Sequence, residues 1–145
     1  MQLISPAFAQ NQHVPTEYTC KGNNISPPLQ IKEVPKDTKS LVLFMHDPDA
    51  PVGDWVHWTV WNIPPDTEEI PENSVPEGAV EGTTSFKDTG YGGPCPPWGT
   101  HRYIFDLYAL DTVLDLKPGA GSDELTAAIK DHISQQTELV GVFSR

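Results

Sequence analysis

The segment Tyr91–Tyr103, YGGPCPPWGTHRY, leads directly into a strand-like run that continues to Leu110. Proline fixes the backbone φ angle and lacks an N–H donor, whereas glycine allows sharp turns and a close approach to a ligand. A rigid loop that delivers a histidine, an arginine and a tyrosine to the start of a strand suits the wall of a binding site. A stiff corner before a core strand would have the same composition, so other segments must distinguish the two interpretations.

Apolar and alternating runs elsewhere in the chain predict a series of strands. The strongest candidates are the apolar run Ser40–His46, the aromatic and β-branched run Trp55–Ile63, and the alternating run Tyr103–Leu110. Side chains that alternate along the last run share one face of the strand, namely Tyr103, Phe105, Leu107 and Ala109. Shorter strands are expected within residues 1–10, at Leu29–Val34, near Ala79–Gly82 and at Leu139–Phe143.

A single helix is expected late in the chain. Ser122 is a candidate N-cap, Asp123 and Glu124 suit the first turn, and an apolar stripe continues to about residue 135. Several strands with long proline-rich connections and one late helix indicate a mostly β fold, a two-sheet β-sandwich with one or two short peripheral helices. The 145 residues show no repeat or linker, so one domain spanning 1–145 is expected.

The composition excludes several classes of function. A net charge of −11 would repel phosphate backbones, which argues against nucleic acid as a partner. No run reaches the roughly 18 apolar residues of a membrane span, so we expect no membrane insertion. The N-terminal sequence MQLISPAFAQ lacks the basic and apolar regions of a signal peptide, which favours a cytoplasmic location.

The two cysteines, Cys20 and Cys95, lie far apart in the sequence and show no CxxC or metal-ligand spacing. In a cytoplasmic protein we expect both of them to be free thiols. A bridge between them stays open, because the sequence does not reveal their distance in space.

Asp47, His57 and His101 each lie in or at the end of a predicted strand. If those strands are neighbours, the three side chains can converge at one end of a sheet. Two partly protonated histidines, oriented by a carboxylate, could bind a phosphate group. The Tyr103 hydroxyl could donate to the same anion, and backbone N–H groups around Gly92–Gly93 could add further contacts.

Other chemistries have weaker support. His57 and His101 with Asp47 or Asp49 form a known type of metal-ligand set, but their spacing is not local. Cys95 near His101 could be a thiol nucleophile, yet no cation or helix N-terminus that would lower its pKa is evident. The sequence contains no GxSxG, GxGxxG or P-loop motif. We therefore expect no catalytic residue, no metal and no cofactor.

Three motifs in order resemble the phosphatidylethanolamine-binding protein (PEBP) family, also called Raf kinase inhibitor-like proteins. They are DPDAP at 47–51, WVHW at 55–58 and PPWGTHRY at 96–103. The segments YTCKGNNISPPL at 18–29 and YGGPCPP at 91–97 resemble the bacterial and archaeal branch. The resemblance implies a sandwich of two antiparallel sheets with a small anion pocket at one end.

The resemblance also implies a function and a set of site residues. It implies a non-enzymatic protein that binds phosphate groups, including those of phosphatidylethanolamine and other phospholipid head groups or of phosphorylated ligands, and that modulates a kinase or another signalling partner. The ligand-binding residues implied are Asp47, His57, Gly93, His101 and Tyr103. The supporting or rim residues expected are Asp49, Trp55, Pro97 and Trp98.

Two alternative functions stay open at this point. The exposed proline-rich loop would equally suit an inhibitor of a protease or kinase that acts by protein interaction. An enzyme that uses His57 and His101 as acid and base is a weaker hypothesis. Bacterial relatives are often dimeric, so the resemblance favours a homodimer.

Overall fold

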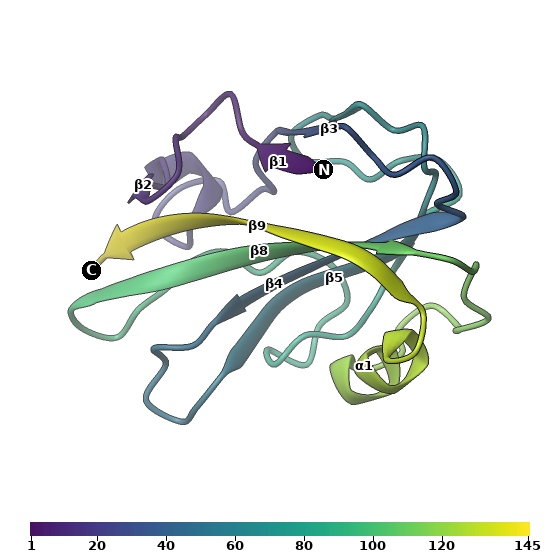
Figure 1. Ribbon diagram of the computed structural model, residues 1–145. Helices are drawn as coiled ribbons and strands as arrows, with labels where there is room; N and C mark the ends of the chain where they lie inside the picture. Colours follow the sequence, from purple (N-terminus) through teal and green to yellow (C-terminus); the bar gives the residue numbers. More distant parts are fainter.

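The computed structural model describes residues 1–145 as two β-sheets and one short helix (Figure 1). The large sheet contains, in spatial order, β2 (Gln12–His13), β9 (Ile133–Ser144), β8 (Thr100–Leu110), β4 (Ser40–Asp47), β5 (Trp55–Ile63) and β7 (Val80–Glu81). The small sheet contains β1 (Gln2–Ile4), β3 (Leu29–Lys32) and β6 (Glu69–Ile70). Neighbouring strands are antiparallel except for the short parallel pair β2–β9. The predicted mostly β, two-sheet fold is confirmed.

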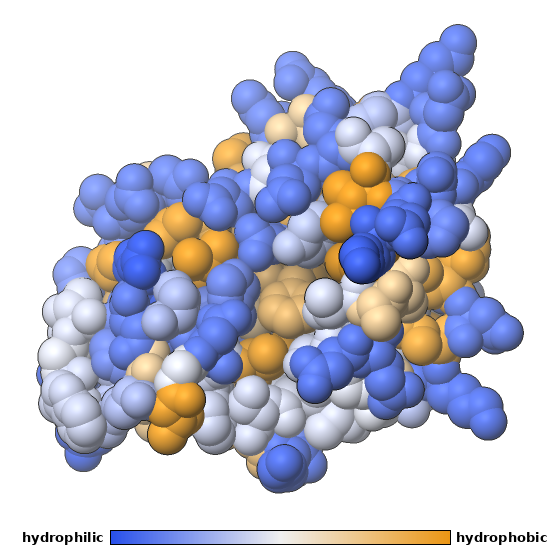
Figure 2. Space-filling view, turned by 60° about the horizontal axis from the view of Figure 1, so that its bottom comes forward, coloured by the Kyte–Doolittle hydropathy of each residue, from blue (hydrophilic) through white to orange (hydrophobic).

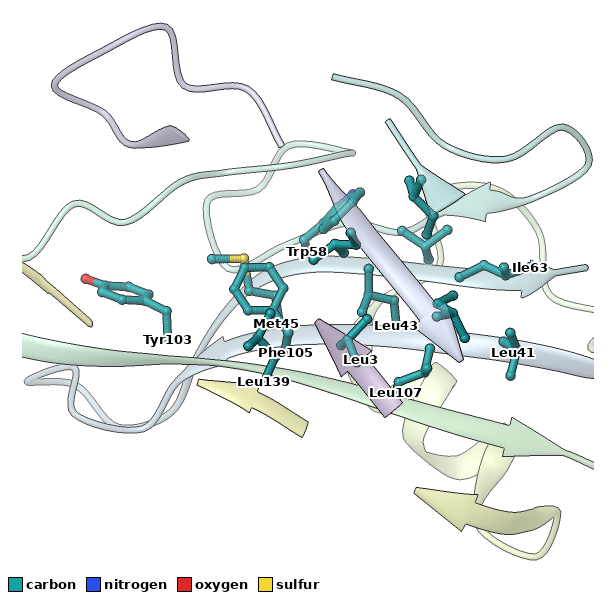
Figure 3. Close-up of a cluster of buried hydrophobic side chains, with 14 of the residues drawn as sticks. Leu3, Leu41, Leu43, Met45, Trp58, Ile63, Tyr103, Phe105, Leu107 and Leu139 are labelled. Atoms are coloured by element: carbon teal, nitrogen blue, oxygen red, sulfur yellow. The ribbon is translucent and has the colours of Figure 1, made fainter. Parts of the chain in front are cut away.

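The main core lies between the two sheets. The alternating face of β8 that the sequence predicted is fully buried there, and it packs with apolar side chains of β4, β5 and β3. Figure 3 shows Tyr103 at one end of this cluster, with its hydroxyl oxygen pointing away from the other labelled side chains. The core therefore ends in a polar group at one end of the large sheet.

A second, smaller core lies on the opposite face of the large sheet, beneath α1 (Ser122–Ile129). Leu125 and Ile129 of the helix pack against Val42 and Trp61 of the sheet. Next to the helix is a hollow of about 380 Å³ whose lining includes Phe44. Figure 2, which brings this side forward, shows apolar side chains in a hollow bordered by hydrophilic ones. The helix thus covers only part of the outer face.

The helix differs from its prediction at both ends. Its N-cap is Gly121, whose N–H donates to Glu124 Oε1 at 3.2 Å, so the assignment of Ser122 as N-cap was wrong. It ends at Ile129, whereas the apolar stripe suggested about residue 135. The following segment extends β9 instead, because pairing with β8 satisfies its backbone groups over the full length of that strand.

The α1 helix lacks the length and apolar character of a membrane span.

Cys20 and Cys95 form a disulfide with a Cα–Cα distance of 5.4 Å. The expectation of two free thiols was therefore wrong. The cysteines are 75 residues apart in the sequence, and only the folding of the Pro94–Pro97 loop against the segment that follows η1 (Thr16–Tyr18) brings them together.

Candidate functional site

A cavity of about 270 Å³ lies at the end of the large sheet, between the β4–β5 turn and the loop before β8. Figure 1 shows β4, β5 and β8 side by side in this sheet. Three separate parts of the chain line it. They are the turn residues Asp47, Ala50, Pro51 and Val52; the β5 side with Trp55, His57 and Phe86; and the last segment with Cys95, Pro96, Pro97, His101 and Tyr103. The structure thus brings four predicted ligand-binding residues, Asp47, His57, His101 and Tyr103, around one cavity.

Antiparallel pairing explains why Asp47 and His101 meet. Asp47 ends β4 and His101 is near the start of the neighbouring strand β8, so both lie at the same end of the sheet. His101 Nδ1 donates to Asp47 Oδ2 at 2.7 Å, and both side chains are almost completely buried. The other oxygen of Asp47 accepts the backbone N–H of Asp49 at 2.8 Å. The carboxylate therefore orients the imidazole and leaves Nε2 without a protein partner.

His57 reaches the cavity because of a bulge in β5. Met45 pairs with Trp58 and His46 pairs with Val56, so His57 is the extra residue on the bulged strand. Its ring lies edge-to-face on Tyr103, at 5.2 Å between centroids. Trp61, further along the same strand, packs instead into the second core beneath α1.

The protonation of His57 follows from its burial and its hydrogen bond. Nδ1 donates to the carbonyl oxygen of Gly92 at 2.6 Å. Burial lowers the pKa of His57, although the Gly92 carbonyl and the Asp47 carboxylate oppose this effect. The imidazole is therefore neutral at pH 7, and its Nε2 is available as an acceptor.

The Tyr103 hydroxyl is buried and forms no hydrogen bond within the protein. The Cys95 backbone lies close enough to influence its pKa but is not in hydrogen-bonding geometry with it. Burial, and then the Asp47 carboxylate, raise the pKa of Tyr103, so the hydroxyl keeps its proton. An unpaired buried donor is uncommon in folded proteins and is often satisfied by a bound group.

Asp49, which the sequence suggested as a supporting residue, is held by Arg102. Its carboxylate accepts two side-chain hydrogen bonds from Arg102, both at 2.9 Å, and the Arg102 backbone N–H at 3.0 Å. The Arg102 guanidinium lowers the pKa of Asp49 to about 2. These bonds tie the β4–β5 turn, and hence one wall of the cavity, to β8.

Besides Asp49, two further predicted site residues, Gly93 and Trp98, lie outside the cavity. The N–H of Gly93 donates to Asn24 Oδ1 at 2.9 Å, so it is not available to a ligand. Gly93 instead lines a neighbouring cavity of about 180 Å³, on the other side of the loop. Trp98 is 66% exposed and is not among the side chains that line the cavity.

Phe86 is an aromatic wall residue that the sequence did not indicate. Its ring lies edge-to-face on both Trp55 and His57, at 5.5 and 5.2 Å between centroids. It comes from the long acidic connection between β5 and β8, which shows no periodicity. A lone aromatic residue in such a segment would have been the only available signal.

The chain is similar to known proteins over almost its full length. The phosphatidylethanolamine-binding protein family model matches residues 4–144. A UPF0098 protein of Methanothermobacter thermautotrophicus is 47% identical, over 100% of this chain and 99% of its own. One of Chlamydia trachomatis is 41% identical over the same shares of the two chains.

Two solved structures have the same fold. A PEBP homolog from Chlamydia trachomatis superposes with a TM-score of 0.95 and 40% identity, covering 99% of this chain and 97% of that one. Escherichia coli YbcL, described as a new member of the mammalian PEBP family, superposes with a TM-score of 0.93 and 31% identity over 99% and 98% of the two chains. On the family match, the relatives and the shared fold, this chain belongs to the phosphatidylethanolamine-binding protein family.

Proposed function

We propose that this chain is a non-enzymatic binding protein whose cavity holds a phosphate group or a similar small anion of its ligand. The observation that carries this proposal is the buried Tyr103 hydroxyl, a protonated donor with no protein acceptor. The Nε2 atoms of His57 and His101 also lack protein partners, because each ring is held through Nδ1. Three unpaired polar atoms of one cavity match the several oxygens of a phosphate group.

The negative charge of Asp47 in the cavity makes the affinity for an anion depend on pH. The Asp47 carboxylate belongs to the same cavity, so an anion is accommodated best when it carries a proton or when an imidazole is protonated. A phosphate monoanion can donate its P–OH to the neutral His57, and a dianion favours proton uptake by the rings. We therefore expect affinity to fall as pH rises through the second ionisation of the phosphate group, about pH 6, because the P–OH that donates to His57 is then lost.

The walls of the cavity limit the chemistry that can occur there. Most of them are apolar, and the sulfur of Cys95 is bonded to Cys20, which removes the thiol nucleophile considered from the sequence. The family relationship supports a phospholipid head group or another phosphorylated ligand. A kinase or protease partner, a homodimer and a cytoplasmic location stay predictions.

The test is a titration of the protein with O-phosphoethanolamine and, separately, inorganic phosphate, followed by NMR of the histidine side chains. We expect Nε2 of His57 and His101 to shift with either compound. His132, which is hydrogen-bonded to Asp111 at the far end of β8, is an internal control that should not shift. Unchanged His57 and His101 signals at millimolar ligand would refute the proposal.

An inhibition assay distinguishes this function from the alternative of a protease or kinase inhibitor that acts through its exposed loops. If the protein inhibits a protease or kinase and Tyr103→Phe inhibits equally well, the exposed loops rather than the cavity carry that activity. Equal loss of phosphate binding and of inhibition in Tyr103→Phe would instead connect the partner to the cavity.

A further inference from the structure

The disulfide lies in the wall of the proposed anion cavity. Cys95 lines that cavity, and it also lines the neighbouring cavity of about 180 Å³ together with Cys20. The cross-link therefore stands in the partition between the two cavities, and Cys95 is followed directly by the wall residues Pro96 and Pro97.

Few hydrogen bonds hold this wall, although Pro94 and Pro96 are buried. Pro94, Pro96 and Pro97 have no N–H to donate. Three hydrogen bonds join the loop to η1 and the segment after it: Cys20 N–H to Pro94 O at 3.1 Å, Gly93 N–H to Asn24 Oδ1 at 2.9 Å, and Tyr91 Oη to Tyr18 O at 2.6 Å. All three come before Cys95, so the disulfide is the last link to that segment before the wall residues.

Both cysteines are exposed, so a small thiol can reach the bridge. Exposed disulfides are more often labile or regulatory than buried structural ones. Cys20 lines the smaller cavity but not the anion cavity, so an attack on its sulfur need not pass through the anion cavity.

We propose that Cys20–Cys95 is a thiol–disulfide exchange site, and that its reduction by a dithiol weakens ligand binding in the adjacent cavity. A dithiol thiolate attacks one cysteine sulfur and breaks the S–S bond, forming a mixed disulfide. The second thiol of the reductant then displaces the bound cysteine. The protein gains two electrons and two protons as Cys20 and Cys95 become thiols, and the dithiol is oxidised to its own disulfide.

The expected loss of ligand affinity rests on the proposed function. It follows from the greater conformational freedom of the wall residues after reduction. Once the bridge is open, Pro96, Pro97 and the backbone beside the Tyr103 hydroxyl must be ordered when the ligand binds, and this ordering opposes binding. We expect about tenfold weaker affinity, within the usual range of coupling between two sites. By reciprocity, saturating ligand should lower the reduction potential of the bridge by about 30 mV, which corresponds to a tenfold change in a two-electron couple.

The experiment measures the affinity for O-phosphoethanolamine in the oxidised protein and after reduction with dithiothreitol. Alkylation and mass spectrometry should show two modified cysteines only after reduction. The double variant C20S/C95S should bind like the reduced protein and should not respond to dithiothreitol. The His132 signal and the far-UV CD spectrum report whether the fold persists, and the redox midpoint of the unmodified protein with and without ligand provides a second measurement.

The outcomes are distinct. Equal affinity in the two redox states, or an unchanged midpoint with saturating ligand, overturns this inference and leaves the proposed function standing. If dithiothreitol does not reduce the bridge in the folded protein, this inference is again overturned and the proposed function is unaffected. Absence of binding by the oxidised protein overturns both.

Discussion

The side chains of the cavity are held by bonds that leave one polar atom of each free for a ligand. His101 is oriented by Asp47, and His57 by the Gly92 carbonyl. Tyr103 differs, because its ring is packed into the main core while its hydroxyl is unpaired. Removing this one atom therefore tests the site without disturbing the fold.

For Tyr103→Phe we expect about tenfold weaker binding of O-phosphoethanolamine, because one hydrogen bond to a charged group contributes about 1.5 kcal/mol or more. The free energy of unfolding should be unchanged or slightly higher, since a buried unpaired hydroxyl is lost. Calorimetric titration and urea unfolding measure the two quantities. Tyr108→Phe, on the outer face near α1, is the matched control and should leave affinity unchanged. Strong destabilisation of Tyr103→Phe would contradict the unpaired state of the hydroxyl.

His46 lies outside the cavity and should make stability depend on pH. Burial opposes its charge, but hydrogen bonds to Asp106 at 2.9 Å and Asp54 at 2.7 Å dominate and raise the pKa of His46 to about 8. This contribution is fully present below the unfolded pKa of about 6.5 and is lost as pH rises through 8. Since Asp54 is largely exposed, screening reduces the gain to about 1 kcal/mol.

The measurement is the difference in unfolding free energy between the wild type and His46→Asn at pH 6 and pH 9. We expect the difference to shrink by about 1 kcal/mol at the higher pH. Burial lowers the pKa of His57 and gives its contribution to stability the opposite pH dependence. Burial, the largest cause, is the same in both proteins, so most of this contribution cancels in the difference. His13→Asn, at an exposed position, is the control. A difference that is constant with pH would show that the aspartates do not stabilise the charged ring.

At the level of elements, the site depends on a β-bulge and on a loop that packs against it. The bulge turns His57 toward Tyr103, and Gly92 accepts the His57 hydrogen bond while its N–H donates to the His57 carbonyl at 2.9 Å. Phe86 packs over this contact. A Cβ added at Gly92 would lie 2.6 Å from two carbons of the Phe86 ring, so the loop can approach β5 only with glycine there.

Gly92→Ala should therefore displace Phe86 and disturb the hydrogen bond to His57. We expect destabilisation by about 1–3 kcal/mol, the usual cost of overpacking, together with weaker ligand binding. Urea unfolding and the His57 NMR signal check both effects. Gly121→Ala is the matched control, because its added Cβ would meet only Glu124 Oε1 at 3.9 Å. Equal stability of the two variants would mean that Phe86 moves aside freely.

For the whole molecule, the disulfide is the longest-range covalent constraint. It joins residues separated by 75 positions, and a cross-link of this span stabilises by about 4 kcal/mol through the unfolded state. We expect C20S/C95S to unfold at a correspondingly lower urea concentration, and reductant to lower the wild type to the same midpoint. A loss below about 1 kcal/mol would indicate that the unfolded chain already keeps these segments together.

The elements that could be predicted are those with a strong local signal. β5 begins at Trp55 and ends at Ile63 as expected, and the buried face of β8 was identified from its alternation alone. β9 was recognised only from residue 139 onward, because its first half is polar and is held by pairing with β8 rather than by burial. The helix end was misplaced for the same reason.

The sequence by itself determined the family and the mostly β fold, and it indicated six residues that line the cavity as candidates, since these rest on residue order and on the period of apolar positions. Only the tertiary structure decided the Cys20–Cys95 bridge, the turning of His57 into the cavity, the contribution of Phe86 and the engagement of Gly93 with Asn24. Each of these depends on strand register or on contacts between distant segments, which no local pattern encodes. The segment Tyr91–Tyr103 is thus a wall of the cavity, held in place by a cysteine that the sequence alone presented as a free thiol.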